Sequence, residues 1–97
     1  MELNELRSQI DAIDKQLIEL FAKRMDVCES IAEYKRQNGI EVYDQKRENA
    51  VLDKVASLCD QKLVEPTVEL YRAIFAISRD YQTKNINEKR PDPEEEV

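Results

Sequence analysis

The most informative absence from this 97-residue chain is histidine, of which it has none. Histidine is the commonest general base near neutral pH and the commonest protein ligand of transition metals. Its absence excludes a catalytic triad of the Ser-His type and makes a zinc site a poor hypothesis. We therefore expect any chemistry in this chain to proceed without rapid proton transfer through an imidazole.

Residues that break helices are also scarce, with one glycine, Gly39, and three prolines, Pro66, Pro91 and Pro93. Charged residues make up 37% of the sequence and apolar residues 41%. This balance is typical of a helical protein with long solvated faces, and it disfavours β-sheet. The length suits one domain. The predicted fold class is therefore all-α, in a single domain.

No segment resembles an export signal or a membrane span. The first residues, MELNELRSQ, are acidic and polar, and no apolar run approaches the ~20 residues that a spanning helix needs. The default expectation is a cytoplasmic protein that does not associate with membranes. The net charge of −6 disfavours a general nucleic-acid-binding protein, because phosphate contacts need a basic surface. Cys28 and Cys59 lack metal-type spacing and lie on apolar helical faces, so we interpret both as small core residues.

The spacing of apolar residues predicts three helices. The first covers residues 3–38 and ends at Gly39, because glycine suits the left-handed conformation that follows a helix. The second follows the short connection IEVY, has its N-cap at Asp44 and ends near Leu63.

The third helix is predicted to begin around Pro66, since a missing N–H costs nothing in the first turn of a helix. Between Leu70 and Ile77 it is apolar over most of its circumference, which is typical of a buried helix. The three helices form the predicted domain, residues 1–84. Residues 85–97 end in NEKRPDPEEEV, which is charged and without periodicity, and we interpret them as a disordered tail or the remnant of a linker.

The length of the first helix determines the expected assembly. At 1.5 Å of rise per residue, a helix over residues 3–38 is ~54 Å long, whereas a compact domain of this size has a radius of gyration of only ~13 Å. Two shorter helices cannot cover the apolar stripe along it, which consists of Leu3, Leu6, Ile10, Ile13, Leu17 and Leu20. We therefore predict an intertwined two-fold homodimer without a separately stable monomer.

The same stripe carries two cations, Arg24 and Lys35. They are eleven residues apart, which is ~20° past three full turns, so both lie on one face of the helix and ~16 Å apart along its axis. A lone arginine would be interpreted as a residue that reaches solvent or fixes register. Two cations on a core-facing side instead require an anion to receive them.

Further polar residues are predicted near the inner faces of the helices. Asp44, Arg47 and Glu48 share one face of the second helix, although a capped helix start with a surface ion pair explains them equally well. Ser78 and Gln82 continue an apolar row of the third helix, or else they mark the point at which that helix frays into solvent.

Arg7 lies ~25 Å from Arg24 along the first helix and points to a different face. In a dimer with antiparallel long helices, Arg7 of one chain could approach Arg24 of the other. Together these side chains predict a polar pocket inside an apolar helical dimer, able to hold a small anion with more than one carboxylate.

Four segments closely resemble the all-α, AroQ-type chorismate mutases. They are LRSQIDAIDKQLIELFAKR in the first helix, the lysine of EYK, the segment YDQKRE and, in the third helix, SRDYQ. The resemblance covers residues 3 to about 84, with the order and spacing of the family. It implies an isomerase that converts chorismate to prephenate on the way to phenylalanine and tyrosine, and that needs neither a metal nor a cofactor.

The resemblance also implies roles for individual residues. Arg7 from the partner chain and Arg24 would bind the substrate carboxylates. Lys35 would face the ether oxygen of the breaking C–O bond and a carboxylate. Gln82 would donate a hydrogen bond to the same ether oxygen.

The remaining roles concern the second and third helices. Glu48, with the backbone near Asp44, would hold the ring hydroxyl, and Arg47 and Ser78 would complete the shell around the carboxylates. One departure from the family is Ala76, where relatives often carry an acidic residue. Ala76 is expected to lie outside the shell of residues that touch the substrate.

The implied reaction fits the composition. It is a unimolecular [3,3] rearrangement with no proton transfer and no covalent intermediate. The enzyme must hold a flexible dianion in a folded, chair-like conformer, which is an entropic task. It must also place hydrogen-bond donors where negative charge develops on the ether oxygen.

Two other interpretations remain open. A non-catalytic helical dimerisation module would bind no small dianion and would tolerate Arg24→Leu. A mutase-like enzyme could instead act on isochorismate. Because relatives are fused to dehydratase, dehydrogenase or synthase domains, the tail is either a native terminus or a cut linker.

Overall fold

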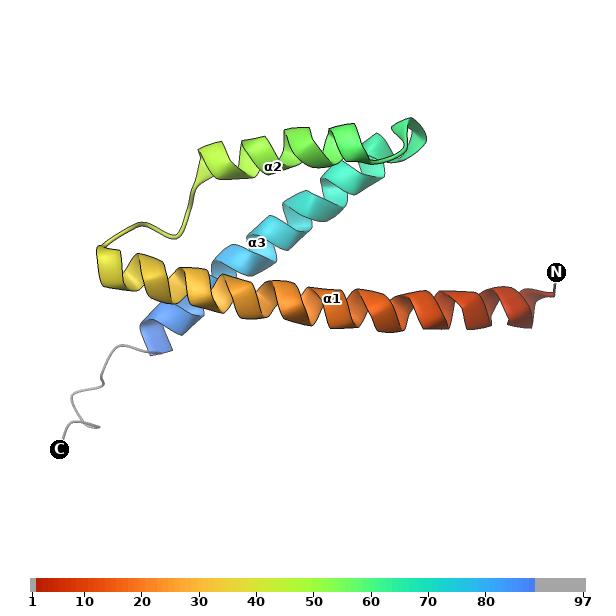
Figure 1. Ribbon diagram of the computed structural model, residues 1–97, viewed down its shortest axis with the longest axis horizontal. Coiled ribbons are helices and arrows are strands. Elements are labelled where there is room, and N and C mark those ends of the chain that lie inside the picture. Colours follow the sequence, from red (N-terminus) through yellow and green to blue (C-terminus); the bar gives the residue numbers. More distant parts are fainter. Residues whose placement is uncertain (1, 89–97) are drawn as a thin grey trace.

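The computed structural model describes residues 2–88, and within them it contains helices and no strand (Figure 1). The elements in chain order are α1 (Leu3–Asn38), α2 (Gln45–Leu58), the 3₁₀ helix η1 (Gln61–Leu63) and α3 (Val64–Glu88). The all-α fold class predicted from the sequence is confirmed. None of these helices is long and apolar enough to span a membrane.

The C-terminus of α1 is built around Gly39, which has a φ of 64°. Its N–H donates to the carbonyl of Arg36, and the N–H of Ile40 donates to the carbonyl of Lys35 at 2.9 Å. These two bonds make a Schellman motif, in which glycine adopts the left-handed conformation without steric strain. The motif ends α1 at Asn38 and turns the chain toward α2 at Gly39, one helical turn after Lys35.

The end of α2 differs from the prediction. The helix stops at Leu58, where the expected end was Leu63, and Cys59 is already extended. Pro66 prevents α2 and α3 from forming one continuous helix, because a proline in a helix interior lacks the N–H for the preceding turn and its ring clashes with the carbonyl there. No residue near Leu58 gives a comparable stop signal. The chain turns through η1 and starts α3 at Val64, which places Pro66 in the first turn.

The end of α3 also extends past the expected domain boundary at residue 84. The helix continues to Glu88, so residues 85–88 are helical rather than part of an irregular tail. No glycine or proline lies between Pro66 and Pro91, and a helix without a stop signal continues past its last packed residue. The rest of the predicted tail, residues 89–97, lies outside the described residues.

Helix α3 joins the fold together, because it packs against both α1 and α2 (Figure 1). The first half of α1 projects beyond this contact, toward the N-terminus. The molecule measures 63 × 31 × 15 Å and has a radius of gyration of 17.8 Å. A compact chain of this length would have a radius of gyration of about 13 Å.

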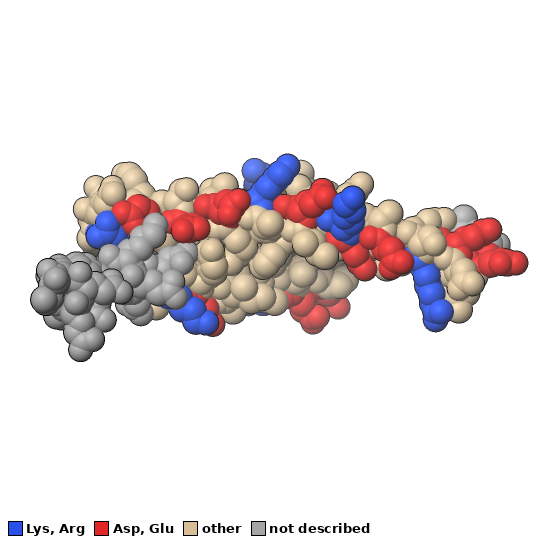
Figure 2. All heavy atoms as spheres, turned by 90° about the horizontal axis from the view of Figure 1, so that it is seen from below, with Lys and Arg blue, Asp and Glu red and all other residues tan. Residues whose placement is uncertain are grey.

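The chain has little core of its own. The buried apolar residues among those described are Cys28, Ala32 and Phe75. The expectation of a buried third helix is wrong for the isolated chain, since Leu70 and Ile77 on α3 are 55% and 50% exposed. Figure 2 shows charged side chains along much of α1, with uncharged surface beside them.

The two cysteines are both free thiols, and they differ in burial. Cys28 is buried as predicted, whereas Cys59, which follows α2, is only half-buried. Neither is in a disulfide.

Candidate active site

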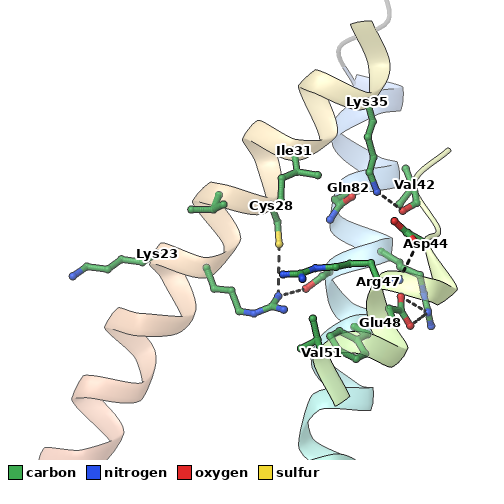
Figure 3. Close-up of a pocket in the computed structure, with 15 residues that line it drawn as sticks. Lys23, Cys28, Ile31, Lys35, Val42, Asp44, Arg47, Glu48, Val51 and Gln82 are labelled. Carbon is green, nitrogen blue, oxygen red and sulfur yellow. Dashed lines mark hydrogen bonds and ion pairs between the residues drawn. The ribbon is translucent and has the colours of Figure 1, made fainter. Parts of the chain in front are cut away.

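A cavity of about 450 Å³ lies between α1, α2 and α3 (Figure 3). This volume falls within the ~300–1,000 Å³ that is usual for small-molecule sites. Basic side chains outnumber acidic ones among the described residues that line it: Lys23, Arg24, Lys35, Arg47 and Arg79 against Asp44 and Glu48. Lys23 points away from the other lining side chains (Figure 3). The excess of cations suits an anionic ligand.

Helix α1 supplies one wall and places both predicted cations on it. The Nη1 atom of Arg24 donates to Ser78 Oγ at 3.0 Å and lies 3.7 Å from Cys28 Sγ. The Nζ atom of Lys35 donates to the Val42 carbonyl at 2.7 Å. The face of α1 that was predicted to carry both Arg24 and Lys35 thus borders the cavity. A hydrogen bond to a residue outside α1 holds each side chain in place.

The N-terminus of α2 forms the second wall. Asp44 is its N-cap, and Asp44 Oδ1 accepts the N–H of Arg47 at 2.9 Å, as predicted. Glu48 does not complete a local ion pair there, because its partner is Arg79 of α3, whose Nη1 lies 2.7 Å from both carboxylate oxygens. The guanidinium of Arg79 also stacks on the ring of Tyr43, 4.9 Å from its centroid. The interpretation of these residues as a mere surface ion pair is therefore incomplete.

The third wall is the row of α3 that contains Phe75, Ser78 and Gln82. Ser78 and Gln82 are 5% and 8% exposed, so the alternative of a helix end that frays into solvent is wrong. Gln82 Oε1 has no hydrogen-bond partner among residues 2–88. Leaving a buried polar atom unpaired costs about 1–3 kcal/mol. Such an atom at a cavity wall suits a site that is completed by a ligand.

Seven of the eight residues predicted for the site border this one cavity, and Arg7 does not. Arg7 is exposed on the projecting half of α1. Its distance from Arg24, ~25 Å along the helix, excludes a shared contact within one chain. Ala76, where the sequence departs from the family, does not line the cavity either, in agreement with the expectation.

Several lining residues were not predicted from the sequence as part of the site, and Arg79 is the most consequential of them. Its signal was present, since Arg79 follows Phe75 by four residues and so continues a row of α3 that faces inward. Val42 lines the cavity from the connection between α1 and α2, where periodicity gives no guidance. Cys28 was expected in the core and proves to line the cavity as well.

The chemical abilities of the cavity follow from its side chains. Cations can bind carboxylates, and an ammonium and an amide can donate to an oxygen that gains charge. Among residues 2–88 there is no group of three or more His, Cys, Asp or Glu side chains able to hold a metal ion. The arrangement is suited to binding and electrostatic stabilisation.

A family model described as chorismate mutase type II matches residues 6–83 of the chain. A chorismate mutase from Methanocaldococcus jannaschii is 30% identical over 96 residues, which cover 91% of this chain and 97% of that protein. The T-protein of Haemophilus influenzae is 44% identical over 50 residues, or 52% of this chain and only 13% of that much longer protein.

A third relative is a 4-amino-4-deoxychorismate mutase from Streptomyces venezuelae, which is 34% identical over 55 residues. That match covers 57% of this chain and 53% of the relative. No solved structure matches the chain significantly.

Proposed function

This chain belongs to the chorismate mutase type II family, and from that premise we propose that it rearranges chorismate to prephenate in a homodimer whose sites draw on both chains. Prephenate formation would serve the biosynthesis of phenylalanine and tyrosine. The observation that carries the proposal is a cavity rich in cations and lined by no histidine, between helices that match the family. We propose residues 1–84 as the catalytic domain.

In this proposal, arginine side chains bind the carboxylates of the substrate. Chorismate is a dianion, and guanidinium groups bind carboxylates through paired, charge-assisted hydrogen bonds. In this proposal Arg24 and Arg47 of one chain and the partner subunit's Arg7 bind the two carboxylates, with the Ser78 hydroxyl beside Arg24. Holding both carboxylates at fixed separation restricts the side chain of chorismate to the folded conformer, which removes much of the entropic barrier.

Lys35 and Gln82 are assigned to the ether oxygen. In the rearrangement a C–O bond breaks while a C–C bond forms, no proton is transferred, and negative charge accumulates on the ether oxygen in the transition state. Lys35 uses one N–H for the Val42 carbonyl, which leaves two for the substrate. Lys35 and Gln82 point into the same part of the cavity (Figure 3). Donors fixed in advance around a developing oxyanion lower the barrier without reorganisation.

The ring hydroxyl of chorismate needs an acceptor, and the cavity offers the carboxylates of Asp44 and Glu48. Asp44 already accepts the N–H of Arg47 as the N-cap of α2. The Glu48 side chain is only 20% exposed and is held by Arg79. We therefore propose that Glu48 accepts the hydrogen bond of the ring hydroxyl. Asp44 caps the N-terminus of α2 and so places the backbone beside that hydroxyl.

The dimer is proposed from the exposed stripe of α1. All residues from 3 to 23 are exposed in the isolated chain, including Leu6, Ile10 and Leu17. A contiguous apolar stripe of this length marks an interaction surface. A second copy related by a two-fold axis would cover it with the same stripe and would bring the partner subunit's Arg7 toward the cavity.

The direct test is to incubate the purified chain with chorismate and follow both loss of chorismate and formation of prephenate. Arg24→Ala, purified in the same way, controls for contaminating mutase. We expect prephenate from the parent and almost none from the variant. Lack of prephenate with the parent, as a folded dimer, would contradict the proposal. The isochorismate alternative is tested in a parallel incubation with that substrate.

A further inference from the structure

We propose that Arg79 is a positioning residue that makes this site select a neutral hydroxyl over a cationic amine on the substrate ring. The inference rests on the proposed function, because it concerns the substituent that faces Glu48. It adds a specificity determinant to the residues that bind and polarise chorismate.

Three elements meet at Arg79. Its guanidinium reaches from α3 to Glu48 on α2, with Nη1 2.7 Å from Oε1 and from Oε2. Tyr43, in the connection between α1 and α2, supports the same guanidinium at 4.9 Å from the ring centroid. An aromatic face attracts a guanidinium and fixes its plane. Arg79 thus fixes the Glu48 carboxylate from one side, and the Tyr43 ring in turn fixes the guanidinium of Arg79.

The position of the ion pair separates two cavities. Glu48 and Arg79 line the main cavity, and together with Tyr43 and Arg72 they also line a smaller one of about 260 Å³. The pair therefore forms part of the wall between the two spaces. Each Glu48 oxygen retains a further lone pair after accepting from Arg79, and it can accept a hydroxyl from the main cavity.

The charge of Arg79 distinguishes between substrates at this position. A ring hydroxyl is neutral and needs only an acceptor, which Glu48 remains. A ring amine is protonated near neutral pH and would favour an unpaired carboxylate. Here the carboxylate is already paired, and the ammonium would approach a second cation within a few ångströms of Glu48, at which distance like charges repel even when partly solvated.

The test compares chorismate with 4-amino-4-deoxychorismate, the analogue that carries an amine in place of the ring hydroxyl. For each variant we would measure kcat/KM with chorismate and the inhibition constant of the analogue against chorismate turnover. The variants are Arg79→Gln, which removes the charge, and Arg79→Lys, which retains it. Arg72→Gln is the matched control, because Arg72 lies seven residues earlier on α3 and lines the smaller cavity, but makes no hydrogen bond or ion pair with Glu48.

We expect Arg79→Gln to shift selectivity toward the amine by about tenfold, which corresponds to about 1.4 kcal/mol. Arg79→Lys should shift it much less, and Arg72→Gln should leave it at the parental value. Selectivity is taken as the ratio of KM for chorismate to the inhibition constant of the analogue. A loss of folded enzyme alone would lower kcat and leave this ratio unchanged. Arg79→Leu provides a second neutral variant, which should reproduce the shift of Arg79→Gln.

An unchanged ratio in both neutral variants, with the parent active on chorismate, would overturn the role of Arg79 and leave the proposed function intact. An equal shift in Arg72→Gln would also overturn it, since net charge rather than the pair would then set selectivity. A folded parent without activity on chorismate would instead overturn the proposed function, and the role of Arg79 with it.

Discussion

The two halves of α1 share the same helical spacing of apolar residues, but one half is exposed and the other packs against the rest of the chain. Residues 3–23 contact no other element closely enough to be buried, and their apolar stripe is open. In residues 24–38 the helix packs against α3, buries Cys28 and Ala32, and presents Arg24 and Lys35 to a cavity. One continuous helix therefore combines an uncovered apolar surface with a polar site.

This contrast shows why the apolar pattern alone cannot identify function. In the first half, each step of three or four residues gives leucine or isoleucine, as in a surface that meets another helix. In the second half, the same steps give Arg24 and Lys35 as well as Ile31. Removing a cation from water costs free energy, so cations in an apolar row are expected where a bound anion can pair with them. The first half is suited to assembly and the second to binding.

The largest effect is expected from a charge in the first half. Leu17→Asp should prevent dimerisation and abolish activity, because it places two carboxylates in the proposed interface and removes two leucines worth about 1.5–3 kcal/mol each when buried. Gln16→Asp is the matched control, since it puts the same charge on the neighbouring residue outside the stripe. Sedimentation velocity and the prephenate assay measure the outcome. A fully active Leu17→Asp monomer would show that one chain suffices.

The next largest effect belongs to the second half. Lys35→Ala should lower kcat by ~10²–10³, the usual loss on removing one donor to a developing oxyanion. The dimer should persist, because Lys35 lies outside the stripe of the first half. Lys46→Ala, which changes a lysine that does not line the cavity, should retain parental activity. A kcat for Lys35→Ala within a few-fold of the parent would remove Lys35 from the ether oxygen.

A pH-dependent effect is expected for Gln82→Glu. An amide donates a hydrogen bond at any pH, whereas a carboxyl group donates only while it is protonated. Above the pKa of the new carboxyl group, activity should therefore fall by about tenfold for each pH unit and recover as the pH is lowered. Gln61→Glu, outside the cavity, should keep the parental profile. A flat profile for Gln82→Glu between pH 4 and 8 would contradict the role of Gln82.

The smallest effect is the change in stability of Arg24→Leu. Leucine extends the apolar row and removes a half-buried charge, so the melting temperature should stay the same or rise, although activity is lost. The hydrogen bond to Ser78 is lost, and its net contribution is only about 0.5–1.5 kcal/mol. Thermal unfolding by circular dichroism measures the change. A large fall in melting temperature would favour a structural role for Arg24.

The sequence predicts the fold best where it carries local signals. Gly39 and Asp44 mark the end of α1 and the start of α2, because a left-handed residue and a side-chain cap each have a strong residue preference. The end of α2 carries no such signal, and the prediction misses it by five residues. The end of α3 is missed for the same reason.

The candidate site was predictable to the extent that helical spacing and family motifs determine it. Spacing along α1 puts Arg24 and Lys35 on one face, and motifs add Glu48 and Gln82. The partner of Glu48 was not predictable from spacing, because Arg79 is 31 residues away and the contact depends on how α2 and α3 pack. The support that Tyr43 gives Arg79 depends on the path of a connection without periodicity.

The central claim is that one site needs both halves of α1, from different chains. The most direct test unfolds Arg7→Ala and Arg24→Ala together and refolds them in equal amounts. Each variant alone should be nearly inactive. Random pairing makes about half of the dimers mixed, and each mixed dimer has one complete site and one that lacks both arginines. The account predicts recovery of about a quarter of parental activity. No recovery, with mixed dimers verified by mass spectrometry, would contradict it.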